Sequence, residues 1–408
     1  MVYTYKIGIS EVVHDSFVKK SSKTNLLQSS QWAKVKNEWH NERLGFFKDG
    51  ELVAVASVLI RKLVNLTNFT MIYIPRGPIM DYQDEELVSF VIMSLKEFGE
   101  QQRSIFIKFD PFLTLSEQVI NEQMTENQSV LEVKERLIKL GCSWYGRAQT
   151  LSDTIQPTHH AMLYNEYFSE NLLNKRVRQN IRTARNKGVE IYYGREELLD
   201  DFSELLKKTE RRKSINLRGK SYYRKILEAF PKDAYIVLAY LNVLDRYQHL
   251  LNTKENLVKE SHYFTSNTRQ SKIDNHTNKL GRVNKEIEFL ESELRNNRII
   301  VPLAATLTID FGETSENIYA GMDDNYKHYQ PALLTWLETA KYAFERGVAW
   351  QNLGGVEPKL DGGLYHFKSH FNPVIEEYIG EFDLVVSPLL YKLFQLLFEI
   401  RKKLRKKD

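Results

Sequence analysis

The same order of strand and helix signals occurs twice along this chain, and this repetition constrains the fold more than any other feature. In the first half, apolar segments at 44–47 and 52–60 flank an Asp-Gly pair at 49–50, which is a strong signal for a β-hairpin. The signals that follow are a strand at 69–74, a helix at 85–101 and a strand at 104–109.

The second half repeats this order. Its expected elements are strands at 234–241, 299–310 and 316–320, a helix from Pro331 to Arg346, and a strand at 349–353. A proline is well suited to the first turn of a helix. The repetition predicts an α/β (α+β) fold of two similar domains that arose by internal duplication, each with mostly antiparallel strands and one covering helix.

The second copy carries a long insert, residues 242–297, where the first has a hairpin turn. Apolar or near-apolar residues recur there in alternating three- and four-residue steps. They are Leu244, Tyr247, Leu251, Lys254 and Val258, and then Ile273, His276, Leu280, Val283, Ile287, Leu290 and Leu294. Two heptad arms joined by a polar turn predict an antiparallel coiled-coil hairpin that projects from the sheet. Such an arm serves either as a spacer or dimerisation element or as a nucleic-acid contact.

Cysteine content and apolar runs limit the class of protein. Cys142 is the only cysteine, so no intrachain disulfide framework is possible, and no Cys/His cluster indicates a metal site. The N-terminus lacks the apolar region of a signal peptide, and no run of about 18 apolar residues occurs. We therefore expect a cytoplasmic protein without a structural metal.

The net charge is only +4, but the basic residues are clustered. Segment 175–187 holds six Lys/Arg and no acid, segment 207–225 holds nine bases and one acid, and segment 401–407 holds six bases. Such blocks favour polyanionic partners such as nucleic acid, phosphates or anionic lipid, although solvated helix faces have the same composition.

The last basic block ends a helix predicted after Ser387-Pro388. Its apolar residues share one face, and they are Leu389, Leu393, Leu396, Leu397, Ile400 and Leu404. An apolar stripe followed by a basic end is typical of peripheral contact with an anionic membrane. The alternative is a helix docked on the core with a solvated tail.

Several common catalytic motifs are absent from the sequence. There is no Walker loop, no dinucleotide fingerprint after a strand, no Gly-x-Ser-x-Gly elbow and no His-Glu-x-x-His. The repeated unit resembles the acetyltransferase-like (GNAT) fold, whose members hold coenzyme A on a Gly-rich turn. The corresponding turns here, at 76–81 and 321–325, lack repeated glycines, so we do not expect coenzyme A as a cofactor.

A set of short motifs, in order along nearly the whole chain, resembles the Fem family and most strongly its MurM-type branch. The motifs are Gln31–Lys36, Tyr73–Pro78, Phe109–Pro111, Thr154–Pro157, Arg178–Arg182, Gly354–Pro358, Leu364–Phe371 and Tyr378–Glu381. The resemblance implies two GNAT-like domains, with 1–150 plus 379–408 as the first, 151–241 plus 298–378 as the second, and 242–297 as the coiled-coil arm.

The resemblance also implies an activity. Members of this family move an amino acid from aminoacyl-tRNA, which serves as co-substrate without a further cofactor, to the side-chain amine of the stem-peptide lysine in a peptidoglycan precursor. The MurM-type branch uses alanine or serine and prefers the lipid-linked precursor, lipid II. The product begins or extends the interpeptide bridge. The expected location is the inner face of the plasma membrane.

The resemblance suggests which residues bind the precursor. Lys36 and Arg212 match the family's precursor-phosphate residues, and the neighbouring Arg211 makes the second assignment ambiguous by one position. Trp32 precedes Lys36 by four residues, so the two share one helix face.

Lys368 aligns with the lysine of the family's Tyr-x-Phe-Lys motif, which is proposed to stabilise the tetrahedral oxyanion, and Tyr365 would line the same site. From the residues alone, a buried ion pair of Lys368 with Glu357 or Glu381 is the alternative. Asp110 at a strand end is a candidate base or a turn cap.

Two rival functions remain at this point. One is a coenzyme A-dependent GNAT acyltransferase, and the other is a non-catalytic coiled-coil adaptor that binds RNA or membrane.

Overall fold

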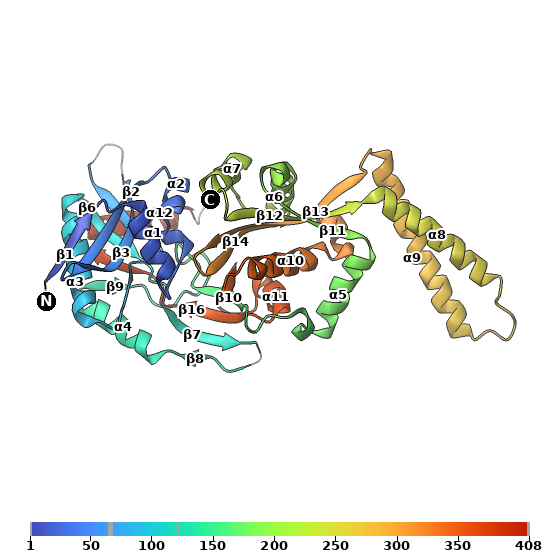
Figure 1. Cartoon of the computed structure of the whole chain (residues 1–408), viewed down its shortest axis with the longest axis horizontal. Coiled ribbons are helices and arrows are strands. Elements are labelled where there is room, and N and C mark those ends of the chain that lie inside the picture. The colour runs from blue at the N-terminus through green and yellow to red at the C-terminus, as the bar shows by residue number, and fades with distance from the viewer. Residues whose placement is uncertain (1, 64–67, 121, 406–408) are drawn as a thin grey trace.

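The computed structural model describes residues 2–63, 68–120 and 122–405, and of 398–405 it describes the helical backbone. The molecule is elongated: two β-sheets with their covering helices form the body, and a pair of long helices projects from one end (Figure 1).

The first sheet has eight strands, in the order β1-β2-β3-β4-β6-β17-β9 with β5 paired to β3. The predicted hairpin joins β2 to β3, and Asp49 and Gly50 both adopt positive φ, as a tight turn of the type predicted requires. The strands are β1 (Tyr3–Ile7), β2 (His40–Lys48), β3 (Glu51–Lys62), β4 (Thr70–Ile74), β5 (Ile79–Met80), β6 (Ser104–Phe109), β9 (Cys142–Trp144) and β17 (Phe382–Val385).

The second sheet has nine strands, in the order β11-β12-β13-β14-β15-β10-β16-β7-β8. They are β7 (Thr114–Val119), β8 (Thr125–Glu126), β10 (His159–Tyr164), β11 (Val189–Gly194), β12 (Ala234–Asn242), β13 (Ile300–Phe311), β14 (Thr314–Met322), β15 (Trp350–Gly355) and β16 (Val374–Tyr378).

The predicted duplication is confirmed. Each sheet contains a strand, its antiparallel hairpin partner, a third strand, a helix, and a strand parallel to the third. The first series is β2-β3-β4-α3-β6 and the second is β12-β13-β14-α10-β15, and both β4–β6 and β14–β15 are parallel pairs. The two crossover helices are α3 (Glu85–Gln101) and α10 (Pro331–Glu345). Asp84 caps the first through the Leu87 N–H, and Pro331 opens the second.

Helices cover both faces of the second sheet (Figure 1). On one face, α6 (Leu199–Lys213) and α7 (Lys220–Ala229) share an apolar core with α2 (Ser30–Val35) from the N-terminal part of the chain. On the other face, α5 (Lys175–Asn186) and α10 pack on a separate core. The remaining helices of the body are α1 (Glu11–Lys20), α4 (Gln128–Lys139), α11 (Gly363–Lys368) and α12 (Pro388–Arg405), and the short 3-10 helices are η1 (Leu26–Gln28), η2 (Glu170–Leu172), η3 (Glu196–Leu198), η4 (Asp324–Tyr329) and η5 (Ser369–Phe371).

The two halves exchange strands. β7 and β8 lie in the range 1–150 that we predicted for the first domain, yet they extend the edge of the second sheet through β16. After β16, the chain turns through Gly380 and returns to the first sheet as β17. The first half of the chain therefore contributes β7 and β8 to the edge of the second sheet, and the second half contributes β17 to the first sheet.

The insert forms the predicted antiparallel helical hairpin, α8 (Val243–Ser261) and α9 (Gln270–Arg295). In α9 the predicted seam is confirmed, because His276, Val283, Ile287 and Leu290 are buried.

In α8 three of the five predicted seam residues are wrong by one position: Leu244, Leu251 and Val258 are each 39% exposed, whereas Val243, Leu250 and Leu257 are buried. The other two are partly buried, and Tyr247 packs on the core. Adjacent apolar pairs allow two phases of the same heptad, and the anchoring of Val243 to the Ile299 carbonyl at the sheet favours the inner one.

Helix α12 docks on the first sheet by one side only. Tyr391 is buried against Phe106, with ring centroids 5.4 Å apart, and Phe394 packs on the same ring. The predicted stripe faces away from this contact: Leu389, Leu393, Leu396 and Leu397 are 83, 52, 59 and 57% exposed. Ile400 and Leu404 lie among residues whose side chains are not described. None of the helices in the described residues has the length and apolar character needed to cross a bilayer.

Candidate active site

Lys368 ends α11 and reaches to the edge of the second sheet. Its side chain is 5% exposed, and its ammonium donates a hydrogen bond to the Gly355 carbonyl at 2.8 Å, at the end of β15. The Trp336 ring lies 5.9 Å from the ammonium nitrogen. The lysine is therefore almost fully enclosed by backbone and aromatic groups.

Glu357 and Glu381 were the two possible ion-pair partners of Lys368, and neither of them pairs with it. Glu357 accepts the backbone N–H groups of Leu364 and Tyr365, at 3.1 and 2.9 Å, and so caps the start of α11. Glu381 pairs with Lys108 at 3.0 Å. Among the described residues, no acidic group lies within salt-bridge distance of Lys368, so its charge is buried without an ion-pair partner.

Burial has a large effect on this ammonium. Desolvation lowers the pKa of Lys368 to about 7, and the more distant charge of Glu357 opposes the shift only in part. A group with this pKa is charged in a large fraction of molecules at neutral pH. An anion brought by a substrate would restore the missing partner and favour the charged form.

Lys368 lies where the second sheet opens. The parallel strands β14 and β15 are in register over three residues, 314–316 against 350–352, although both continue further. Just beyond, Gly354 adopts φ +88°, and a Cβ there would stand 3.3 Å from the ammonium nitrogen and 3.7 Å from the Asn317 carbonyl oxygen. The glycine thus leaves space for the lysine between the diverging strands.

A buried polar cluster joins the two halves near this opening. The Arg76 guanidinium lies 3.5 Å from the Asp110 carboxylate and donates to the Pro157 carbonyl at 2.7 Å. It also lies 3.0 Å from the His160 ring nitrogen. Burial raises the pKa of Asp110 to about 6 and lowers that of His160 to about 3, where nearby Arg76 and Lys368 act in the same direction. Asp110 is thus held by Arg76, and its role as a base stays a prediction.

A second cationic site lies between α2 and α7. The Lys36 ammonium is 4.9 Å from the centroid of the Trp32 ring and 5.2 Å from that of Tyr222, and it donates to the Tyr222 hydroxyl at 2.8 Å. The Arg218 guanidinium stacks on the other part of this cluster, 5.1 Å from the Tyr222 ring.

Burial and then the charge of Arg218 lower the pKa of Lys36. In the described structure neither cation forms a salt bridge, so both charges are available to an anion.

Comparisons with known proteins agree with this arrangement. A model of the FemAB family matches residues 9–399. This chain belongs to the FemAB family. It is 28% identical over 414 residues to a lipid II:glycine glycyltransferase of Staphylococcus aureus strain MRSA252, covering 96% of this chain and 95% of that protein. The crystal structure of FemX is similar with a TM-score of 0.75 and 26% identity, over 96% of this chain and 99% of FemX. The chain is therefore a transferase, built from two GNAT-like domains.

The two arginines predicted to bind the precursor phosphates together with Lys36, Arg212 and Arg211, are not part of the Lys36 cluster. Arg212 pairs with Asp324 at 2.7 Å, near the N-terminal side of α10, and Arg211 is exposed on α6. The charged neighbours that act on Lys36 are Arg218, Glu38 and Lys225. Arg212 as a phosphate ligand stays a prediction, whereas Arg218 and Tyr222 are residues that the sequence reasoning missed. Arg218 and Tyr222 lie in the second half of the basic segment 207–225, and no local pattern sets them apart from its other residues.

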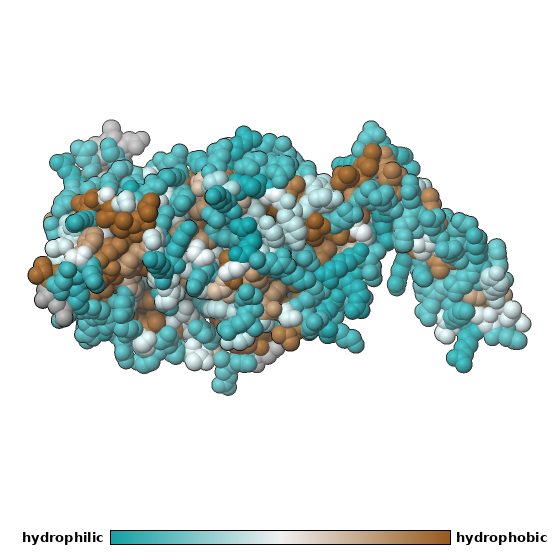
Figure 2. Space-filling model, viewed as in Figure 1, coloured by the Kyte–Doolittle hydropathy of each residue, from teal (hydrophilic) through white to brown (hydrophobic). Residues whose placement is uncertain are grey.

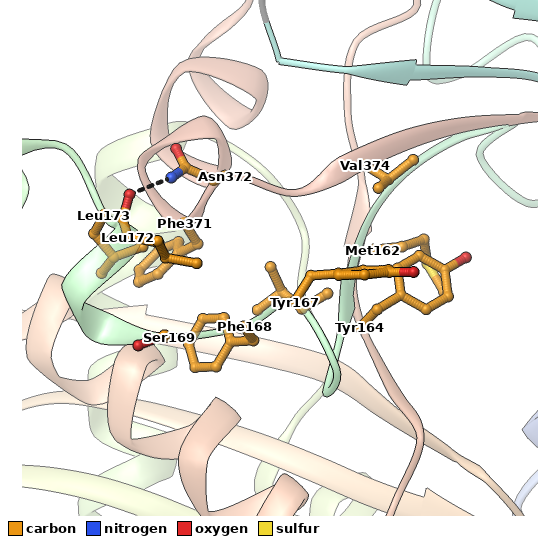
Figure 3. A pocket seen from close by; sticks show the side chains of 11 residues that line it. Met162, Tyr164, Tyr167, Phe168, Ser169, Leu172, Leu173, Phe371, Asn372 and Val374 are labelled. Carbon is orange, nitrogen blue, oxygen red and sulfur yellow. Dashed lines mark hydrogen bonds between the residues drawn. The ribbon is translucent and has the colours of Figure 1, made fainter.

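Tyr365 lies one turn before Lys368 and is partly buried on the core shared by α5 and α10. The end of this turn is fixed by Asn372, whose side-chain amide donates to the Leu172 carbonyl at 2.9 Å (Figure 3). A small pocket of about 50 Å³ lies beside this contact, lined mainly by apolar and aromatic side chains such as Phe168 and Phe371 (Figure 3). It is too small for a nucleotide or a lipid chain, so we assign it a packing role.

Within the described residues, no group of three or more His, Cys, Asp or Glu side chains is arranged to hold a metal ion.

Proposed function

We propose that this chain transfers an amino acid from aminoacyl-tRNA to the side-chain amine of the stem-peptide lysine of lipid II, and so builds the interpeptide bridge. One observation carries the proposal: Lys368 is buried, has no ion-pair partner in the described structure, and lies where β14 and β15 separate. The named S. aureus relative acts on lipid II.

The chemistry requires little of the enzyme beyond positioning and charge. The substrate amine attacks the ester carbonyl carbon, and the carbonyl electron pair moves to oxygen to give a tetrahedral oxyanion. The ammonium of Lys368 stabilises this oxyanion. When it collapses, the ester bond to the tRNA ribose breaks, an amide bond remains, and the proton lost by the amine balances the one gained by the ribose hydroxyl. Loss of one oxyanion donor typically costs about 100- to 1000-fold in rate.

The second cationic site suits the diphosphate of the lipid-linked precursor. Lys36 offers a compact charge and Arg218 a planar fork, and both lie free of acidic partners in the described structure. Trp32 and Tyr222 hold the Lys36 ammonium in place.

The structure offers no Gly-rich turn between β14 and α10. The 3-10 helix η4 occupies this connection, which supports the proposal that the donor is a tRNA ester and not coenzyme A.

The exposed leucines of α12 support peripheral membrane contact at the inner face of the plasma membrane, where lipid II is made accessible to a cytoplasmic enzyme. The sequence continues from this stripe into the basic segment 401–407, which would face anionic headgroups. Residues 406 and 407 lie outside the described residues.

Two indications of the donor amino acid disagree. The resemblance to the MurM-type branch favours alanine or serine, and the named relative transfers glycine. An assay with purified lipid II and tRNA charged with Ala, Ser or Gly decides between them, because the product mass identifies the amino acid added. Absence of product with all three would contradict the proposal, and acetylation of an amine with acetyl-coenzyme A would favour the rival acyltransferase.

A further inference from the structure

A second feature near Lys368 has no role in the mechanism above. A cavity of about 400 Å³ lies between α5, the first turn of α10 and the turn after α11. Its volume is within the range of roughly 300–1,000 Å³ typical of ligand sites. The lining residues are Arg176, Asn180, Met322, Lys327, Gln330, Pro331, Ala332, Leu333, Phe367 and His370.

The polar groups of this cavity all suit an anion. Arg176 and Lys327 supply positive charge, Asn180 supplies an amide, and none of the lining residues is acidic. The Lys327 ammonium also lies 3.2 Å from the exposed carboxylate of Asp324, so Arg176 is the cation of the cavity that forms no salt bridge in the described structure. The cavity also adjoins the N-terminus of the 15-residue helix α10, where no side chain caps the first N–H groups. The helix dipole therefore adds positive potential at the same place.

The basic block on α5 continues this potential outward. Lys175, Arg176 and Arg182 form no salt bridge in the described structure, and of the six bases at 175–187 only Arg185 does so, with Glu170 and Glu338. Figure 2 shows a continuous hydrophilic surface in this region. The basic block at 207–225, on α6 and α7, has a larger share of its bases in ion pairs.

Ion pairs with acids in the same part of the fold occupy four of the bases at 207–225, namely Lys207, Lys208, Arg212 and Lys220. Five of the six bases in the α5 block lack a salt bridge in the described structure, against five of the nine at 207–225, so the α5 block has the larger share of its charge available to a polyanion.

The cavity lies close to the proposed reaction centre. Phe367 directly precedes Lys368 in the chain, and His370 follows by two residues, so the same turn lines the cavity and positions the catalytic lysine. The cavity is on the face of the second sheet that bears α5 and α10, whereas the Lys36–Arg218 site is on the face that bears α6 and α7. Substrates on opposite faces would meet where β14 and β15 separate.

We propose that this cavity binds the 3′-terminal phosphates of the aminoacyl-tRNA, with Arg176 and Lys327 as phosphate ligands, and that the α5 block follows the RNA backbone beyond it. This inference rests on the proposed function and adds where the RNA end lies. A single-stranded RNA end suits this cavity, because cations and a helix N-terminus can hold its phosphodiester. The esterified ribose would then be directed at Lys368.

The test uses full-length R176A/K327A enzyme. Both side chains are exposed at the surface, so their removal leaves the fold intact. The matched control is K96A/K139A, which removes two exposed lysines from the first domain. KM is measured for charged tRNA and, separately, for lipid II. Binding of an uncharged hairpin that ends in the single-stranded tRNA 3′ terminus is measured between 50 and 200 mM salt.

We expect R176A/K327A to raise KM for charged tRNA about 10-fold or more, with KM for lipid II unchanged. The slope of log affinity against log salt should fall by about 1.4, because each single-strand phosphate contact contributes about 0.7. The control should match the wild type in all three quantities.

Unchanged tRNA KM and salt slope in R176A/K327A, with an active wild type, would overturn the inference and leave the proposed function intact. Acetyl-coenzyme A binding by the wild type that is lost specifically in this variant would also overturn the inference, and it would favour the rival acyltransferase over the proposed function. An inactive wild type would instead contradict the proposed function itself.

Discussion

At the scale of the residue, the central feature is the buried ammonium of Lys368, which has no ion-pair partner among the described residues. A buried charge that is not paired shifts its pKa toward the neutral form, and the pKa of Lys368 falls to about 7. In the proposed mechanism, an oxyanion that forms beside Lys368 offsets the cost of holding this charge in the free enzyme, so the interaction would be stronger in the transition state than in the ground state.

This pKa predicts the pH dependence of the reaction. The rate requires a charged Lys368 and a neutral substrate amine, whose ordinary pKa is about 10.4. Below about pH 7 Lys368 stays charged, and log kcat/KM rises with pH as the amine loses its proton. Above about 7 the loss of charge on Lys368 offsets this gain, so the profile levels off.

In K368R the side chain remains charged, and log kcat/KM, however reduced, should continue to rise up to pH 9. A plateau near pH 7 in both enzymes would contradict the assignment.

The stability of the protein has its own pH dependence through Lys368. Between about pH 7 and 10.5 the unfolded state binds more protons at this side chain than the folded state does. The contribution of Lys368 to the free energy of unfolding therefore rises with pH in this range.

The identity of this residue could be predicted from sequence, but its state could not. The motif around Tyr365 and Lys368 indicated a lysine aimed at chemistry or paired with a glutamate. Which glutamate it would meet depends on contacts far apart in the chain: Glu381 is taken by Lys108, and Glu357 caps α11. Neither contact leaves a local signal in the sequence.

At the scale of the element, α7 completes the surroundings of Lys36. Helix α2 presents Trp32 and Lys36, and Tyr222 from α7 completes the enclosure, with Arg218 just before this helix. No sequence pattern singles out one of the nine bases at 207–225, because the choice depends on which of them packs against a segment almost 200 positions away.

We expect K36M and R218M each to raise KM for lipid II about 10- to 100-fold, since charge-assisted hydrogen bonds contribute about 1.5–3 kcal/mol. KM for charged tRNA should stay the same. R212M serves as the comparison, because Arg212 has an ion-pair partner in Asp324. A larger effect of R212M than of R218M would return the phosphate role to Arg212.

Helix α12 supports a separate prediction. The double variant L393D/L396D should reduce binding to anionic lipid vesicles about 10-fold or more, because both exposed side chains would otherwise be buried in the interface. The control L244D/L251D changes two leucines on the arm that are each 39% exposed. Equal binding by both variants would show that α12 is not the membrane contact.

Helix and strand periods were the most predictable level of the fold. The predicted helix at 85–101 and strand at 104–109 coincide with α3 and β6. The failure in α8 came from a sequence that fits two adjacent heptad phases, between which only contact with the sheet decides.

At the scale of the whole molecule, the two duplicated halves act as one unit. The second sheet contains β7 and β8 from the first half, and β17 from the second half lies between β6 and β9 in the first sheet. Arg76 ties the first half to Pro157 and His160 of the second while it pairs with Asp110. The duplication was visible in the sequence, and the resemblance placed 379–408, which contains β17, with the first domain. The placement of β7 and β8 in the second sheet was not predicted, because these strands are short and have no pattern that tells which sheet they join.

Removal of Arg76 tests this connection. R76M leaves Asp110 buried without its cation, and loss of one partner of a buried pair typically costs about 3–5 kcal/mol. Denaturant unfolding should show a clear loss of stability. K34M, which breaks an exposed pair with Glu11, should cost at most about 1 kcal/mol. A loss in R76M no larger than that in K34M would contradict a structural role for the cluster.

The mass of lipid II after incubation with charged tRNA and either wild-type or K368M enzyme tests catalysis by Lys368. With the wild type we expect one added amino acid on the stem lysine. With K368M, which should fold and bind lipid II normally, we expect a rate about 100- to 1000-fold lower. A product formed at near-wild-type rate by K368M, or no product from the wild type with any of the three charged tRNAs, would contradict this role of Lys368.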